Sequence, residues 1–242
     1  MCRLLAYASR EATTFPQVIG PHFDEYVQLS SIHCDGWGIS DSQGDLILDT
    51  TTAKDSAKLA TAVEETESTG ALFHLRWASP GIPVDIANNH PFAFGEYSFI
   101  HNGSLKPYDA LDSILTGKYA AEIKSASDSH RYFMLLMQNI DQVGLQEGIA
   151  KSIKDIRAVA TYASLNAMLL SPDYLVMANE HDVNNRPSIV GEDYYEIRYK
   201  VSADSIAIGS SGWNQDGWVL LPNHTVMIIN RKDLSFNFLD LP

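Results

Sequence analysis

The order of the hydrophobic patterns along the chain restricts its fold more than any other feature. Short runs typical of strands come first, helical patterns follow, and the second half returns to strands. A parallel doubly wound sheet would need a regular alternation of strands and helices, which this order lacks. The sequence therefore predicts a layered α+β fold, in which helices pack on the outside of antiparallel sheets.

Spacing within the runs gives the expected elements. A Thr52/Asp55 capping-box pattern predicts a helix over 52–67, Ser127 is the candidate N-cap of a second helix, and a third is expected over 148–159. A polar stretch over 179–192 predicts a long loop, which is a candidate lid. The expected strands are 4–8, 37–40, 45–48, 71–78, 97–101, 165–170, 174–178, 194–201, 205–209, 225–230 and 235–239.

Composition excludes several classes of protein. The 242 residues include 17 Lys and Arg against 30 Asp and Glu, a net charge of −13. Nucleic acids and anionic membranes bind clustered basic side chains, so we expect neither as a partner. No run approaches the ~20 apolar residues of a membrane helix, and two cysteines are too few for a disulfide framework. We expect one domain over 1–242 in a cytoplasmic protein.

Cys2 is the first candidate for chemistry. If the initiator Met1 is removed, Cys2 carries both a thiol and a free α-amine, whose ordinary pKa of ~7.7–8 suits a base near neutral pH. Together they would form an N-terminal nucleophile. A cysteine near a chain end is more often a buried, inert thiol, so Cys2 alone leaves both interpretations open.

Further motifs follow Cys2 in a fixed order. They are Asp35-Gly36-Trp37-Gly38, Arg76-Trp77-Ala78-Ser79-Pro80-Gly81, Asn89-His90-Pro91-Phe92, His101-Asn102-Gly103 and Ser127-Asp128-Ser129. This set resembles the class II glutamine amidotransferase family. It is most similar to the free-standing subgroup that begins Met-Cys-Arg-Leu, one member of which hydrolyses a γ-glutamyl amide in ergothioneine synthesis. The resemblance implies a four-layer αββα sandwich of two antiparallel sheets with helices outside, which agrees with the layered α+β fold expected from the pattern. It also implies an N-terminal Cys nucleophile.

The resemblance also implies roles for single residues. Asn102 and the N–H of Gly103 would stabilise the oxyanion formed when a thiolate attacks a carboxamide. Arg76 would bind the α-carboxylate of a glutamine-like substrate, because a guanidinium pairs well with a carboxylate. Asp128 would hold the α-ammonium group, although an Asp at a helix start could equally serve the helix dipole.

The remaining site residues are supporting ones. Trp77 and Ser79 are expected to shape the substrate loop, while Gly36, His90 and His101 are assigned to positions around the site. The family often has Thr-His where this chain has Ser79-Pro80, and the lost imidazole leaves both glutamine and a larger γ-glutamyl compound open as substrates. The histidines match no metal-binding pattern such as His-Glu-x-x-His, so we expect no metal and no cofactor.

Two functions fit these expectations. The first is an amidohydrolase that cleaves the γ-carboxamide of glutamine or of a γ-glutamyl compound through a Cys2 thioester. Such an enzyme would act alone or pass ammonia to a separate synthase subunit, because 242 residues leave no room for a synthase domain. The alternative is a non-catalytic sensor that binds γ-glutamyl compounds while Met1 caps Cys2. The sequence does not determine the oligomeric state.

Overall fold

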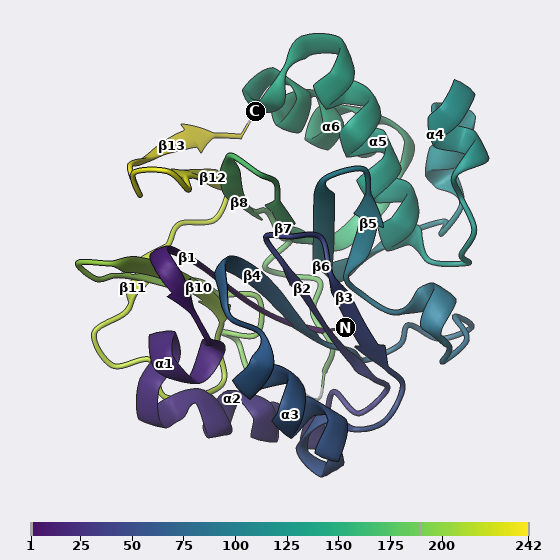
Figure 1. The fold of residues 1–242 in the computed structure, drawn as a ribbon. Helices are drawn as coiled ribbons and strands as arrows, with labels where there is room; N and C mark the ends of the chain where they lie inside the picture. The colour runs from purple at the N-terminus through teal and green to yellow at the C-terminus, as the bar shows by residue number, and fades with distance from the viewer. Residues whose placement is uncertain (1, 189, 242) are drawn as a thin grey trace.

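A computed structural model of the chain describes residues 2–188 and 190–241. These residues form two stacked antiparallel sheets with helices on both outer faces, as Figure 1 shows. The predicted α+β sandwich of αββα layers is confirmed.

The first sheet has the strand order β11-β9-β10-β1-β4-β2-β3. Its neighbouring strands are antiparallel, and β1 lies in the interior between β10 and β4. The strands are β1 (Arg3–Thr13), β2 (Trp37–Asp41), β3 (Leu46–Asp49), β4 (Ser68–Leu75), β9 (Ile197–Val201), β10 (Ser205–Ser210) and β11 (Val219–Leu221).

The second sheet has the strand order β13-β12-β8-β7-β6-β5, also antiparallel. Between Gly103 and Leu105 the register of β6 against β7 shifts at an irregularity. The strands are β5 (Phe92–Phe94), β6 (Tyr97–Lys106), β7 (Thr161–Leu170), β8 (Tyr174–Asn179), β12 (Thr225–Asn230) and β13 (Phe236–Asp240).

Helices cover the outer face of each sheet (Figure 1). The first sheet carries α1 (Phe15–Ile19), α2 (Phe23–Gln28) and α3 (Ala57–Glu65), and the second carries α5 (Asp128–Val143) and α6 (Leu145–Val159), with α4 (Gly117–Ala121) beside α5. Short 3-10 turns complete the set: η1 (Gly20–His22), η2 (Leu29–Ser31), η3 (Ala53–Asp55), η4 (Ile86–Asn88) and η5 (Ala110–Ser113).

Apolar side chains fill three layers, and β1 takes part in two of them. Leu4 and Ala6 pack against the second sheet, whereas Leu5 and Tyr7 pack against α1, α2 and α3. From Arg3 to Ser9 both faces of β1 are buried, so Leu4–Ala8 is an unbroken apolar run instead of an alternating pattern. The strand that follows Cys2 is therefore held in the centre of the sandwich.

Several predicted boundaries were wrong. The helix expected over 52–67 is divided into η3 and α3, because Ser56, and not Thr52, caps α3 by accepting a hydrogen bond from Leu59 N at 3.2 Å. The strand expected over 71–78 ends at Leu75, which leaves Arg76 in the loop that follows. By contrast, Ser127 caps α5 as predicted.

Short elements were missed for a physical reason. Pro16 lies in the first turn of α1, and Pro21 lies in η1 between α1 and α2. Both short helices are held by Phe15, Phe23 and Tyr26, which pack on the first sheet. The loop expected over 179–192 runs from the end of β8 to the start of β9 in the part of the chain described, while Ile189 lies outside the described residues. No helix among the described residues is both long and apolar enough to cross a membrane.

Candidate active site

The topology brings the start of β1 beside the ends of two other segments. Strands β1 and β4 are antiparallel and Arg3 pairs with Leu75, so Cys2 and Arg76 lie next to each other at one end of the first sheet. Strand β2 also reaches this end, because Trp37 pairs with Leu75. The loop before β2 and the loop after β4 therefore border the thiol.

Cys2 is buried between the two sheets. Its Sγ lies 3.8 Å from the carbonyl oxygen of Trp77, and its backbone N donates a 2.8 Å hydrogen bond to Asn102 Oδ1. This bond crosses from the first sheet to β6 of the second. Cys34, the other cysteine, is exposed.

Asn102 and Gly103 lie at the irregularity of β6. The Oδ1 atom of Asn102 is used by Cys2, while its buried Nδ2 has no hydrogen-bond partner among the described residues. A Cβ on Gly103 would stand 1.8 Å from the carbonyl oxygen of Ser164, so only glycine fits this approach. The pair therefore presents an unused amide donor beside the thiol on a backbone with no side chain in the way.

Arg76 is buried but has no acidic partner. Only 3% of it is exposed, and its guanidinium donates to the carbonyl oxygens of Pro83 (2.9 Å) and Asp35 (3.5 Å). It forms no ion pair with an acidic side chain of residues 2–188 and 190–241. A buried cation without a counter-ion is costly, so the position suits an anionic ligand.

Asp128 begins α5 and is also buried. Its Oδ2 accepts a 2.7 Å hydrogen bond from Leu105 N, and Ser127 Oγ accepts one from Ser129 N. The carboxylate thus has the favourable helix-start position. It also lines the cavity that contains Cys2 and Arg76, so one cavity carries a cation and an anion.

Most of the predicted site residues line this cavity. Cys2, Arg76, Trp77, Ser79, His90, His101, Gly103 and Asp128 line it. Asn102 and Gly36 lie outside the lining, although Asn102 Oδ1 accepts the hydrogen bond from Cys2 N. The cavity measures only about 20 Å³, close to the space of a single water molecule. The loop after β4 therefore holds the site nearly closed.

Asp35 fixes this loop, and sequence reasoning gave it no role of its own. Its Oδ2 accepts a 2.8 Å hydrogen bond from Ala78 N, and Asp35 N donates to the carbonyl of Arg76. The following Gly36 has φ of +127°, and a Cβ there would lie 2.7 Å from the carbonyl oxygen of Asp49. In the sequence, the Asp-Gly pair directly before a strand that borders the site could have indicated this role of Asp35.

Two buried histidines, His90 and His101, line the cavity, and the buried ring of His74 packs against that of His90. Burial lowers the pKa of His74 to about 3, and it lowers the pKa of His101 and, more strongly, of His90. His101 Nε2 lies 3.1 Å from the carbonyl oxygen of Ser164, so that nitrogen carries the proton and Nδ1 accepts from Ser129 Oγ at 2.8 Å. These rings are neutral near pH 7, and His101 links β6 to β7 and α5.

Asn166, opposite Asn102 on β7, faces different partners. Its Nδ2 donates to Tyr195 O and its Oδ1 accepts from Glu180 N, both at 2.8 Å. It therefore anchors the loop after β8.

Among the described residues no group of three or more His, Cys, Asp or Glu side chains is placed to hold a metal.

Comparison with known proteins decides the family. Residues 1–184 match the family described as class-II glutamine amidotransferases. The chain belongs to this family. Class-II glutamine amidotransferases are enzymes that hydrolyse or transfer the amide of glutamine, and the chain has the N-terminal cysteine of the family at position 2.

Similarity to curated relatives is distant and partial. The chain is 24% identical to the probable glutamine amidotransferase DUG3 of Saccharomyces cerevisiae, over 78% of this chain and 59% of that protein. It is 28% identical to a glutamine–fructose-6-phosphate aminotransferase of Shouchella clausii, over 79% of this chain and 31% of that protein. The chain thus spans about a third to three-fifths of these relatives.

Solved structures agree on the fold. A class-II domain protein from Silicibacter pomeroyi has a TM-score of 0.69 at 19% identity, with 99% of both chains covered. The glutamine phosphoribosylpyrophosphate amidotransferase of Bacillus subtilis has a TM-score of 0.65 at 17% identity, where the match covers 99% of this amidotransferase and 49% of that chain. These likenesses support the N-terminal-nucleophile hydrolase fold.

Proposed function

We propose that this amidotransferase cleaves the γ-carboxamide of glutamine or of a γ-glutamyl compound through a thioester on Cys2. The thiolate attacks the amide carbon, the C–N bond breaks, and the amine leaves with a proton supplied by the α-amine of Cys2. Water then hydrolyses the thioester to release glutamate. The base in this scheme requires removal of Met1, since only then does Cys2 have a free amine.

The observation that carries the proposal is that one end of the Asn102 side chain amide is hydrogen-bonded to Cys2 and the other end is not hydrogen-bonded to any described residue. Its Oδ1 holds the backbone nitrogen of Cys2, and its buried Nδ2 is without a partner among the described residues. A buried amide without a partner is costly to the folded state. An oxyanion at the attacked carbon would supply that partner, which makes Asn102 a donor to the reaction intermediate.

The cavity's charges suit a zwitterionic end group. Arg76 would bind the substrate's α-carboxylate, and Asp128 would bind its α-ammonium. Both lie in the cavity of Cys2, and neither forms an ion pair with a described residue. An α-amino acid brings one charge of each sign, whereas a simple amide brings none.

Substrate entry requires the loop after β4 to move. The closed cavity of about 20 Å³ cannot hold a glutamine side chain. The Arg76 guanidinium donates to Pro83 O at 2.9 Å, and the substrate carboxylate would replace this neutral acceptor with a charged one. Trp77 and Ser79 would move with the loop and re-form the wall over the bound substrate.

Residues 1–242 would act as one glutaminase domain, which either releases ammonia or passes it to a separate synthase subunit. The experiment is to measure release of glutamate from glutamine and from γ-glutamyl amides. Cys2→Ala should abolish release while leaving the melting temperature close to wild type. Cys34→Ala is the matched control and should remain active. Turnover by Cys2→Ala at the wild-type rate would overturn the proposal, and binding without turnover in the wild type would favour a sensor.

A further inference from the structure

A second cavity lies directly beside the closed site. It has a volume of about 370 Å³, within the range of roughly 300–1,000 Å³ that is typical for small ligands. Trp77, Ala78 and Ser79 line both cavities. The Trp77 carbonyl that stands 3.8 Å from Cys2 Sγ belongs to this shared wall.

The rest of the wall comes from β6 and from two loops. Ser104 and Lys106 follow the Asn102-Gly103 pair on β6, and Pro187 comes from the loop after β8. Tyr108 also lines the cavity, and its hydroxyl donates to Pro80 O at 3.2 Å. The cavity is therefore assembled from the same strand and loop that form the Cys2 site.

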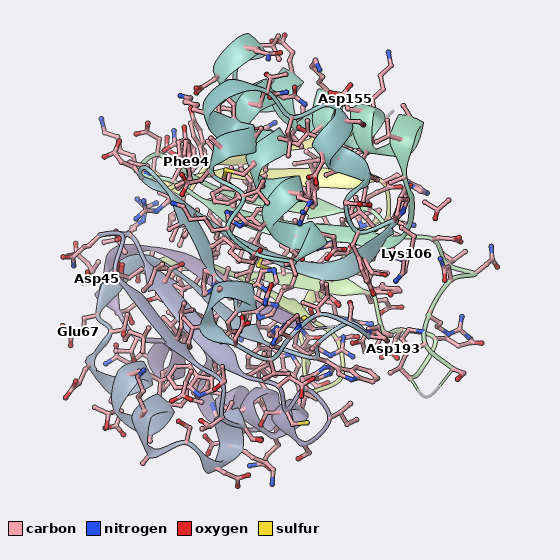
Figure 2. The ribbon with its side chains drawn as sticks, turned by 90° about the vertical axis from the view of Figure 1, so that its right-hand side faces the viewer. Asp45, Glu67, Phe94, Lys106, Asp155 and Asp193 are labelled. Atoms are coloured by element: carbon pink, nitrogen blue, oxygen red, sulfur yellow. The ribbon has the colours of Figure 1, made fainter. Side chains whose placement is uncertain are left out.

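Lys106 supplies a positive charge that has no acidic partner among the described residues. Its Nζ lies 3.5 Å from the centre of the Tyr108 ring, and it forms no ion pair with any residue in the described ranges. Figure 2 shows Lys106 at the side of the molecule, below the outer helices and above Asp193, which belongs to the loop after β8. The cavity thus combines a cation, an aromatic face and two prolines.

We propose that this second cavity binds the amine half of a γ-glutamyl amide, and that the amine half is an α-amino acid whose carboxylate pairs with Lys106. The inference rests on the proposed function. With the glutamyl end held by Arg76 and Asp128, the group beyond the scissile bond extends past Trp77. Ammonia from free glutamine would leave such a volume unused, whereas an amino acid with an apolar side chain fills it against Tyr108 and Pro80.

The test compares three substrates in wild type and in Lys106→Met. The substrates are γ-glutamyl-phenylalanine, γ-glutamyl-phenethylamide, which lacks only the carboxylate, and glutamine. Loss of one charge-assisted bond should lower kcat/KM for γ-glutamyl-phenylalanine about tenfold. The other two substrates should be unaffected. Lys154→Met, at an exposed position on α6, is the matched control and should behave as wild type.

Other outcomes distinguish a failure of the carboxylate subsite from a failure of the proposed function. If Lys106→Met lowers kcat/KM equally for all three substrates, or for none, the carboxylate subsite is wrong. If wild type prefers glutamine to γ-glutamyl-phenylalanine, the subsite is also wrong, but the proposed function stands. If no substrate is hydrolysed and Cys2 forms no adduct with a glutamine analogue, the proposed function fails and the inference fails with it.

Discussion

Replacing Asn102 with Asp tests the oxyanion donor with almost no change of shape. The new side chain keeps an oxygen that can accept from Cys2 N, as Oδ1 does at 2.8 Å. It exchanges the unpartnered Nδ2 for an oxygen that cannot donate when ionised. The substitution therefore removes the proposed donor and leaves the anchor of Cys2 in place.

The magnitude follows from the loss of one donor. Removing a single oxyanion donor raises the barrier by ~2.7–4 kcal/mol, which lowers kcat about 10²- to 10³-fold. Repulsion between the new carboxylate and the oxyanion adds to this loss. We expect kcat to fall at least this far, measured as glutamate release from the best γ-glutamyl substrate at saturation.

Asn166→Asp provides the control. Asn166 is directly opposite Asn102 in the β6–β7 pair and is equally buried, but its amide donates to Tyr195 O, whereas the Nδ2 of Asn102 has no partner among the described residues. Its loss should cost about 1–3 kcal/mol of stability with a much smaller effect on kcat. A decrease in kcat for Asn102→Asp of less than about tenfold, or ~1.4 kcal/mol, would refute the role of Asn102.

Three further predictions address recognition, packing and pH. Arg76→Lys keeps the charge but loses the paired N–H donors, so KM for glutamine should rise about tenfold or more in steady-state assays; an unchanged KM would exclude Arg76 from binding. Gly38→Ala places a Cβ 2.1 Å from His90 O, and urea denaturation should show a loss of about 1–3 kcal/mol; wild-type stability would contradict the close approach. Burial lowers the pKa of His74 to about 3 and that of His130 to about 4, so between pH 6.5 and 4 the unfolded chain binds protons that the folded chain excludes. Stability should therefore fall as the pH falls through this window, and His130→Asn should weaken the dependence; a melting temperature that rises toward pH 4 would reverse the assigned sign.

Local sequence patterns predicted the layers of the fold well. Runs such as Leu4–Ala8 must be buried on both faces, and Ser127 could be identified as a cap from its neighbours alone. Boundaries were less predictable, because tertiary contacts decide them. Strand β4 ends at Leu75, and beyond it the Arg76 backbone bonds to Gly36 and Asp35 in the loop before β2, a contact that no local pattern reveals.

The candidate site was predictable as a set of residues but not as a geometry. The motif order pointed to Cys2, Arg76, Asn102 and Asp128, and the structure brings them together at one end of the sandwich. That Arg76 donates to Pro83 O in a closed cavity depends on the path of a loop with little secondary structure. The second cavity likewise joins Lys106 to Pro187, which are 81 positions apart (187 − 106).

The most direct test of the account is to locate the covalent adduct formed with diazo-oxo-norleucine, a reactive glutamine analogue. The labelled protein would be analysed by intact mass and then by peptide mapping. The account predicts a chain that has lost Met1 and carries one adduct on Cys2, with the exposed Cys34 unmodified. An unlabelled Cys2, or an adduct on Cys34 alone, would contradict the assignment of Cys2 as the nucleophile.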